Sequence, residues 1–244
     1  MFAPVIPSSG LSGWRFLQRT YDVQFAAFSA SARQARATEY FEQNIAKVTS
    51  AEELVADRQL LEVALGAFGL EGDIDNRYFI KKVLEEGTIN SDSLANRFSN
   101  PNYAELSAAF GFGPGEVPRA GLSASTNRVL EKYKASSFEI ATGNQDDSMR
   151  VALYAQRALS DVAQMEGSND TKWFTLMGQP PLRALFEKAL NLPASFGQID
   201  IDQQLNVFQE RAEATFGSSD LSQFSEPENI DAVITKYVVR TQLD

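Results

Sequence analysis

The spacing of apolar residues most constrains the fold of this chain. Near the N-terminus such residues recur every three or four positions, at Trp14, Leu17, Tyr21, Phe25, Phe28, Ala32 and Ala35. This spacing places them on one face of an α-helix. The same period continues in later segments, and no stretch shows the sustained two-residue alternation of a half-buried strand. We therefore predict an all-α fold, a multi-helix array.

The positions of the helix ends are also indicated. The first apolar stripe changes phase toward Phe41 and Ile45, which predicts a bend or break near Ser29 to Ser31 and two helices in place of one. A single long helix that curves is the alternative. Ser50-Ala51-Glu52-Glu53 has the form of a capping box, in which the serine and the last glutamate satisfy amide groups at a helix start.

Part of the helical pattern occurs twice, in residues 60–110 and again in residues 182–234. Gly69-Leu70 corresponds to Asn191-Leu192, Asp73-Ile74-Asp75 to Asp200-Ile201-Asp202, and Phe98-Ser99-Asn100-Pro101 to Phe224-Ser225-Glu226-Pro227. The order of these motifs is the same, and their offsets differ by only a few residues. We interpret the segments as two diverged copies of one helical unit. If the copies pack alike, Phe98 and Phe224 should contribute similarly to stability.

Glycine and proline indicate the domain organisation. Residues 1–10 predict a flexible N-terminal tail, and residues 11–244 predict a single helical domain. The densest glycine and proline cluster, residues 111–121, predicts a loop or linker. Two pseudo-repeat halves, residues 11–113 and 122–244, joined by this linker, are the alternative organisation.

The composition excludes several kinds of active site. The 244 residues include neither cysteine nor histidine. Disulfides, thiolate nucleophiles and cysteine-ligated metal sites are therefore impossible. A serine–histidine triad and a histidine–carboxylate metal site are impossible as well. We predict a protein that is not an enzyme and that holds no cofactor or metal.

The charge of the chain limits its partners. Its 22 Lys and Arg residues against 32 Asp and Glu residues give a net charge of −10, which argues against nonspecific binding of nucleic acid or anionic membranes. No run approaches the roughly 18 apolar residues of a membrane helix. Residues 1–10 lack the basic and apolar segments of a secretory signal. We expect a cytoplasmic protein, or one exported without a cleavable signal peptide.

Several segments resemble a known family, and the resemblance extends over nearly all of residues 13–239. They are Glu39-Tyr40-Phe41, residues 57–70, Ala95-Asn96-Arg97-Phe98, Lys172-Trp173-Phe174, Pro181-Leu182-Arg183 and Asp200-Ile201-Asp202-Gln203-Gln204. The family is alphaproteobacterial and is classed as a domain of unknown function. Its members are often encoded within or beside flagellar gene clusters. The resemblance implies a helical protein linked to flagellar assembly or motility, and it supplies no functional residue.

Closely spaced carboxylates are the candidates for metal binding or acid–base chemistry. The two pairs are Asp73 with Asp75 and Asp200 with Asp202, and the adjacent acids are Glu85 with Glu86 and Asp146 with Asp147. A calcium loop needs a glycine where Tyr78 and Leu205 stand, so we interpret the pairs as helix caps. Adjacent acids beside helix ends are usually solvated. A carboxylate-dependent enzyme or small-molecule binder is the alternative function.

Large aromatic residues are the candidates for a partner surface. They are Trp14, Tyr21, Phe25, Trp173 and Phe174. Tryptophan is over-represented at binding hot spots, and a terminal amphipathic helix rich in aromatics commonly docks on another protein. For the Trp173 segment, burial in the core is the more ordinary interpretation.

These observations favour a non-catalytic helical interaction or assembly protein that binds another protein, without nucleic acid and without insertion in a membrane. The resemblance adds the flagellar link. A homo-oligomer is compatible with the sequence, and an exported structural component is a further alternative.

Overall fold

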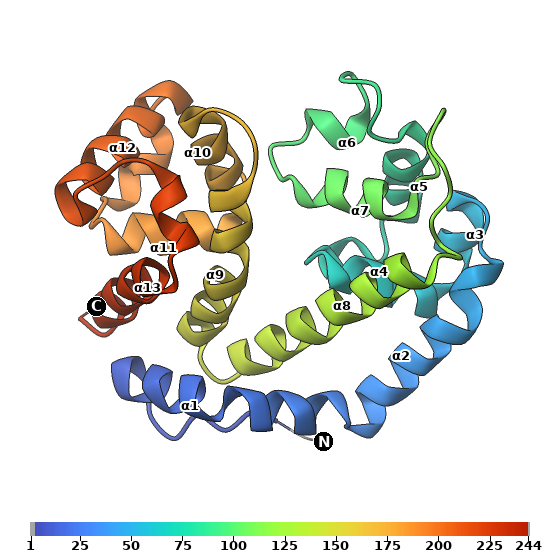
Figure 1. Ribbon diagram of the computed structural model, residues 1–244, viewed down its shortest axis with the longest axis horizontal. Helices are drawn as coiled ribbons and strands as arrows, with labels where there is room; N and C mark the ends of the chain where they lie inside the picture. Colours follow the sequence, from blue (N-terminus) through green and yellow to red (C-terminus); the bar gives the residue numbers. More distant parts are fainter. Residues whose placement is uncertain (1–2, 244) are drawn as a thin grey trace. The chain divides into compact units, whose positions relative to one another are not determined.

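The computed structural model describes residues 3–243, which form helices and connecting loops without any strand (Figure 1). The prediction of an all-α fold is confirmed. The α-helices are α1 (Gly10–Ser29), α2 (Ala32–Asn44), α3 (Ala51–Ala56), α4 (Arg58–Ala67), α5 (Arg77–Glu86), α6 (Leu94–Arg97), α7 (Asn102–Phe110), α8 (Ser123–Gly143), α9 (Asp147–Gln164), α10 (Asn169–Met177), α11 (Pro180–Ala189), α12 (Ile201–Phe216) and α13 (Pro227–Thr241). Short 3-10 helices lie between them, η1 (Ile45–Lys47), η2 (Glu71–Asp73), η3 (Ala194–Gln198) and η4 (Leu221–Ser225).

Two predicted helix boundaries are found in the structure. The break near Ser29 to Ser31 is confirmed, because α1 ends at Ser29 and α2 begins at Ala32. Ser50 caps α3, its Oγ accepting a hydrogen bond from the Glu53 amide at 3.3 Å. The Glu53 carboxylate accepts from the Thr49 amide at 2.7 Å, and this bond lowers the pKa of Glu53.

The helices form two compact units. Among the described residues, unit 1 comprises Tyr21–Ala141 with residues 3–4, and unit 2 comprises Val5–Thr20 and residues 142–243. The boundaries fall within α1 and α8, so each unit takes part of both helices. The units do not coincide with the predicted halves, since the loop of residues 111–121 lies inside unit 1.

The start of the chain is nonhelical between residues 3 and 7. Pro4 is buried, so this part of the predicted tail contacts the rest of the protein. Met1 and Phe2, which also belong to the predicted tail, lie outside the described residues. None of the helices formed by residues 3–243 has both the length and the apolarity that a membrane span needs.

Unit 1 is built around α4, which is apolar on nearly every side. All residues from Leu60 to Ala67 except one are buried, as expected for a helix surrounded by others. It packs against α2 and α3, and α5 packs against α6 and α7. Gly66 allows a ring to lie close to the helix, because a Cβ there would stand 3.0 Å from two ring carbons of Tyr133 on α8.

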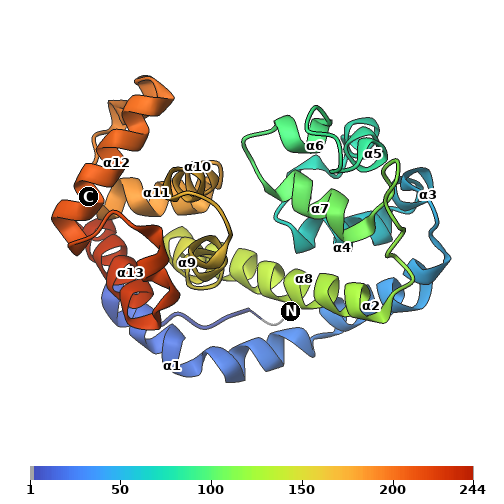
Figure 2. The ribbon, with the colours of Figure 1, turned by 45° about the horizontal axis from the view of Figure 1, so that its top comes forward.

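Unit 2 is built around α9, α11 and α13, which pack against one another (Figure 2). Aromatic rings fill the space beside α11. Phe186 lies 5.5 Å from both Trp173 and Phe224, and Trp173 stacks on Phe208 at 5.6 Å. Edge-to-face and stacked pairs at these separations add stability beyond the area that they bury.

Candidate functional site

Unit 1 contains a groove of about 390 Å³ whose walls are α7 and α8. Its lining residues are Phe68, Glu105, Ala108, Ala109, Arg119, Ala124, Ser125, Arg128, Val129 and Lys132. Within each helix the lining residues are three or four positions apart, so each helix offers one continuous face. Phe68 follows the last residue of α4, and Arg119 comes from the loop of residues 111–121.

Short side chains keep this groove open. Ala108 and Ala109 of α7 and Ala124 and Ser125 of α8 cannot fill the space between their helices. The apolar lining includes Val129 and Phe68, which are only 2% and 7% exposed. The groove therefore combines a hydrophobic base with walls that leave room for a ligand.

The loop of residues 111–121 holds one wall of the groove in position. Glu116 accepts hydrogen bonds from the amide and hydroxyl of Thr88, at 2.6 and 2.8 Å, and from the Gly113 amide at 3.3 Å. Arg119 donates its own amide to Phe110 O at 2.9 Å and its Nη1 to Ala108 O at 2.8 Å. These bonds fix the loop on Thr88, which follows α5, and on α7, and they hold Arg119 at the groove.

The charge of Glu116 strengthens this anchor. Burial alone would raise the pKa of Glu116, but the hydrogen bonds from Thr88 and Gly113 and the nearby Arg119 together lower it. The carboxylate is therefore ionised when it accepts these bonds, and charge-assisted bonds are the stronger kind.

The charge of the groove is opposite to that of the whole protein. Arg119, Arg128 and Lys132 line it with a single carboxylate, Glu105, whereas the chain carries a net charge of −10. Lys132 pairs with Glu105 at 2.6 Å and lies 5.0 Å from the centre of the Phe68 ring. Arg128 is exposed and forms no ion pair within residues 3–243. The groove can therefore attract an anionic group.

The structure places both candidate tryptophans in the core, which for Trp173 agrees with the more ordinary interpretation of its sequence. Trp14 and Trp173 have no exposed area. Trp173 donates its indole N–H to Ser219 O at 2.9 Å, which satisfies the polar atom of a buried ring. Because a side chain without exposed area offers no contact surface, neither tryptophan can contact a partner in this structure.

The other three aromatic candidates retain exposed area. Tyr21 and Phe25 are half-buried in unit 1, with edge-to-face contacts to Phe138 of α8 at 5.5 and 5.7 Å. Phe174 is 38% exposed on α10 of unit 2. These residues belong to different units, so we assign no common surface to them.

The predicted capping carboxylates differ between the two repeat copies. Asp200 caps α12 and accepts a hydrogen bond from the Asp202 amide at 2.9 Å, as predicted. The cap prediction is wrong for the first copy, because Asn76 precedes α5 there. Asp73 instead accepts from the Tyr103 hydroxyl at 2.8 Å, and Asp75 pairs with Arg58 at 2.9 Å.

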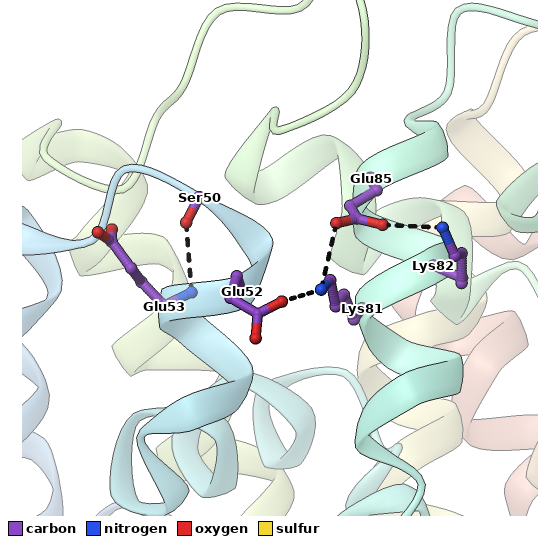
Figure 3. Close-up of polar contacts among 6 residues, drawn as sticks. All are labelled: Ser50, Glu52, Glu53, Lys81, Lys82 and Glu85. Carbon is purple, nitrogen blue, oxygen red and sulfur yellow. Dashed lines mark hydrogen bonds and ion pairs between the residues drawn. The ribbon is translucent and has the colours of Figure 1, made fainter.

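The adjacent acids are engaged in local contacts. Glu85 pairs with Lys82 at 3.2 Å and with Lys81 at 3.7 Å, and Lys81 also contacts Glu52 of α3 (Figure 3). Glu86 accepts a hydrogen bond from the Leu94 amide at 2.7 Å. The Glu85 pairs lie within α5, and the contact of Lys81 with Glu52 joins this helix to α3, so Glu85 has a structural role.

The other adjacent acids lie at the start of α9. Asp146 caps this helix by accepting from the Ser148 amide at 2.9 Å, and Asp147 pairs with Arg150 at 2.7 Å. Within residues 3–243, no group of three or more aspartate or glutamate residues could hold a metal ion.

The cations of the groove were not selected from the sequence. Arg128 and Lys132 are four residues apart, but this spacing is equally typical of a solvated helix face. Arg119 stands in a glycine- and proline-rich segment that predicts only a loop. Their shared role depends on α7 and α8 lining the same groove, which no local pattern reveals.

Comparisons with known proteins found one family match and a similar solved structure. The family model described as "Protein of unknown function (DUF1217)" matches residues 67–230, more than half of the chain. A crystal structure of a protein from Agrobacterium tumefaciens is similar, with a TM-score of 0.80, 23% sequence identity and coverage of 98% of each chain. At this identity the likeness shows the fold alone. No curated protein matches the sequence.

Proposed function

We propose that this chain, which belongs to the DUF1217 family of proteins of unknown function, is a non-catalytic interaction protein that binds a protein partner through the groove of unit 1. The observation that supports this function is the charge of the groove. Its three cations and apolar base differ from the acidic surface expected of a protein with a net charge of −10. Such a site favours partners that present an anionic group over other proteins of the cell.

The process that we propose is flagellar assembly or motility. The support for it is the family resemblance described from the sequence, since related chains are often encoded with flagellar genes. The protein would act there as an assembly factor, which binds a component without transforming it.

Deletion of the gene tests this process. We expect loss of swimming or of normal filaments, restored by a plasmid copy of the gene. Normal motility with intact flagella in the deletion strain would contradict the flagellar role.

Complementation with a blocked groove tests the site. Ala124 is an exposed lining residue, so Ala124→Trp should obstruct the groove without disturbing the core. Ala35 on α2 is an exposed alanine of the same unit and gives the matched control, Ala35→Trp. We expect the control to restore motility and the blocked variant to fail. Full restoration by Ala124→Trp would rule out the groove as the functional surface.

Fractionation separates the two proposed locations. A cytoplasmic assembly factor should be recovered with the cell contents, and an exported component with sheared filaments or the periplasm. Recovery mainly from filaments would favour a structural role over that of an assembly factor.

A further inference from the structure

We propose that the groove of unit 1 binds a short acidic segment of another protein, in which carboxylates flank one aliphatic side chain. This inference rests on the proposed function and specifies the chemistry of its partner. It follows from the charges, the dimensions and the apolar base of the groove.

The cations differ in how far they are already neutralised. Lys132 has a partner, the Glu105 carboxylate at 2.6 Å. Arg119 uses one N–H on Ala108 O, at 2.8 Å. Its charge also acts on the nearby Glu116 carboxylate, whose pKa it lowers, without a direct ion pair within residues 3–243. An arginine carries five N–H donors, so donors remain for a ligand. Arg128 is exposed and likewise has no ion-pair partner in that range. Two arginines therefore offer geometry suited to carboxylates.

The apolar base requires an apolar group in the ligand. A free anion would contact the arginines and leave the partly exposed alanines of the lining, Ala108, Ala109 and Ala124, uncovered. Burying an aliphatic side chain against this surface adds about 25 cal/mol for each Å² of apolar area removed from water. A segment with both kinds of side chain matches the groove better than either kind alone.

The dimensions favour a peptide over a larger polyanion. The α8 wall extends from Ala124 to Lys132, about 12 Å along a helix. An extended chain covers this length with about four residues. A nucleic acid would place further phosphates beyond the groove, against a chain whose net charge is −10.

Glu105 acts as an internal competitor. Its carboxylate occupies Lys132 and repels an incoming acidic group at the same wall. Glu105→Gln should therefore tighten binding of an acidic segment, whereas a residue with only a structural role in the groove would not have this effect. A gain of affinity from removing an acid is a specific signature of the proposed ligand.

Fluorescence anisotropy with a labelled peptide tests the inference on the full chain. The probe is Asp-Asp-Leu-Asp-Asp, and its controls are Asn-Asn-Leu-Asn-Asn, which lacks charge, and Asp-Asp-Gly-Asp-Asp, which lacks the aliphatic group. We expect the probe to bind at least about tenfold more tightly than either control, and its affinity to fall as salt rises. Equal binding of a control, or no saturable binding up to about 1 mM probe, would overturn the proposal.

Charge reversal gives the matched pair of variants. Arg128→Glu should weaken probe binding by about tenfold or more. Arg36→Glu on α2 changes the net charge equally at an exposed position outside the groove, and it should leave binding nearly unchanged. Glu105→Gln should strengthen binding several-fold. Equal losses in both arginine variants would indicate only a general charge effect and would contradict the proposed site.

Two further measurements distinguish other occupants. If sedimentation shows self-association that Arg128→Glu abolishes, the occupant is a second copy of this chain, and our choice of another protein is wrong. If a labelled oligonucleotide binds as tightly as the probe, the site recognises polyanions in general. If Ala124→Trp abolishes swimming while no acidic peptide binds, the proposed function stands and the acidic ligand is refuted.

Discussion

The two segments predicted to be repeat copies share an order of elements but bury their corresponding residues differently. Both contain a helix, a 3-10 helix, a second helix, a short helical turn and a last helix, from α4 to α7 and from α11 to α13. Phe98 of the first copy is 39% exposed, whereas Phe224 of the second is fully buried. Local sequence thus produces similar elements, and the surrounding helices decide how far each corresponding residue is buried and what it contributes to stability. The duplication itself stays a prediction.

The first pair of corresponding motifs, Gly69-Leu70 and Asn191-Leu192, has the same backbone conformation in both segments. Gly69 and Asn191 adopt left-handed backbone angles, with φ of 67° and 57°. In each case the next amide bonds to a carbonyl five residues earlier, Leu70 to Leu65 and Leu192 to Glu187, both at 2.9 Å. This is the Schellman ending of a helix, which glycine favours most and asparagine tolerates.

The third pair of corresponding residues, Phe98 and Phe224, should give the largest difference in stability. Phe224→Ala removes a fully buried ring that contacts Phe186 and Phe216, and it should cost about 3–5 kcal/mol. Phe98→Ala should cost only about 1 kcal/mol, because its contacts with Phe79 and Tyr103 lie at the surface. Urea unfolding followed by circular dichroism measures both changes.

Tryptophan fluorescence sharpens this test, since Trp14 and Trp173 both lie in unit 2. Phe224→Ala should shift the fluorescence transition, and Phe98→Ala should leave it unchanged. Equal losses of stability at the two positions would show that the copies bury the phenylalanines alike in solution.

The anchor of the groove loop should give the next largest effect. Glu116→Gln keeps one acceptor oxygen but loses the charge that Thr88 and Gly113 contact, and it should cost about 1–3 kcal/mol at neutral pH. Because the pKa of Glu116 is lowered in the folded state, its contribution is present above pH ~4.5 and is lost as the pH falls below that value.

Urea unfolding at pH 7 and pH 3 checks the direction of this pH dependence of stability. The wild type should lose more stability than Glu116→Gln over this range, in the circular dichroism transition. A cost that is the same at both pH values would show that the charge of Glu116 does not stabilise the loop.

Two tyrosines with raised pKa values should respond to alkali, the partly buried Tyr103 in unit 1 and the buried Tyr237 in unit 2. Burial raises the pKa of Tyr103 and of Tyr237 to about 12, and the hydrogen bond to Asp73 adds to the shift of Tyr103. The raised pKa stabilises the folded state below pH ~10, and this stability is lost as the pH rises from about 10 to about 12.

Phenylalanine substitutions separate the two contributions. Tyr237→Phe should make the fluorescence transition of unit 2 less sensitive to alkali. Tyr103→Phe should leave that transition unchanged and reduce only the alkaline loss seen by circular dichroism. Identical effects of both variants on fluorescence would contradict the assignment of one tyrosine to each unit.

Exchange of the helix-ending residues should give the smallest effects. Asn191→Gly should stabilise the protein by up to about 1 kcal/mol, because glycine adopts a positive φ without steric cost. Gly69→Asn should destabilise it by a similar amount, because a residue with a Cβ carries a steric cost at this positive φ. No clash adds to that cost, since a Cβ at Gly69 would lie 3.7 Å from its nearest side-chain atom. Thermal unfolding of the two variants measures both signs. Destabilisation by Asn191→Gly would contradict the shared Schellman geometry.

The sequence by itself determined the helices and many of their ends. The break between Ser29 and Ala32, the cap at Ser50 and the turns at Gly69 and Asn191 depend on residues only a few positions apart. Periodicity and capping act over such short distances, so a single sequence reveals them.

Only the tertiary structure decided which residues could form a site. The groove needs Phe68, Arg119 and Lys132, which come from three separate elements, and its loop wall depends on the contact between Glu116 and Thr88. The large aromatics that the sequence favoured as a surface include two that the core encloses. Burial is set by neighbours distant in the chain, and hydrophobic patterns alone do not distinguish a buried ring from an exposed one.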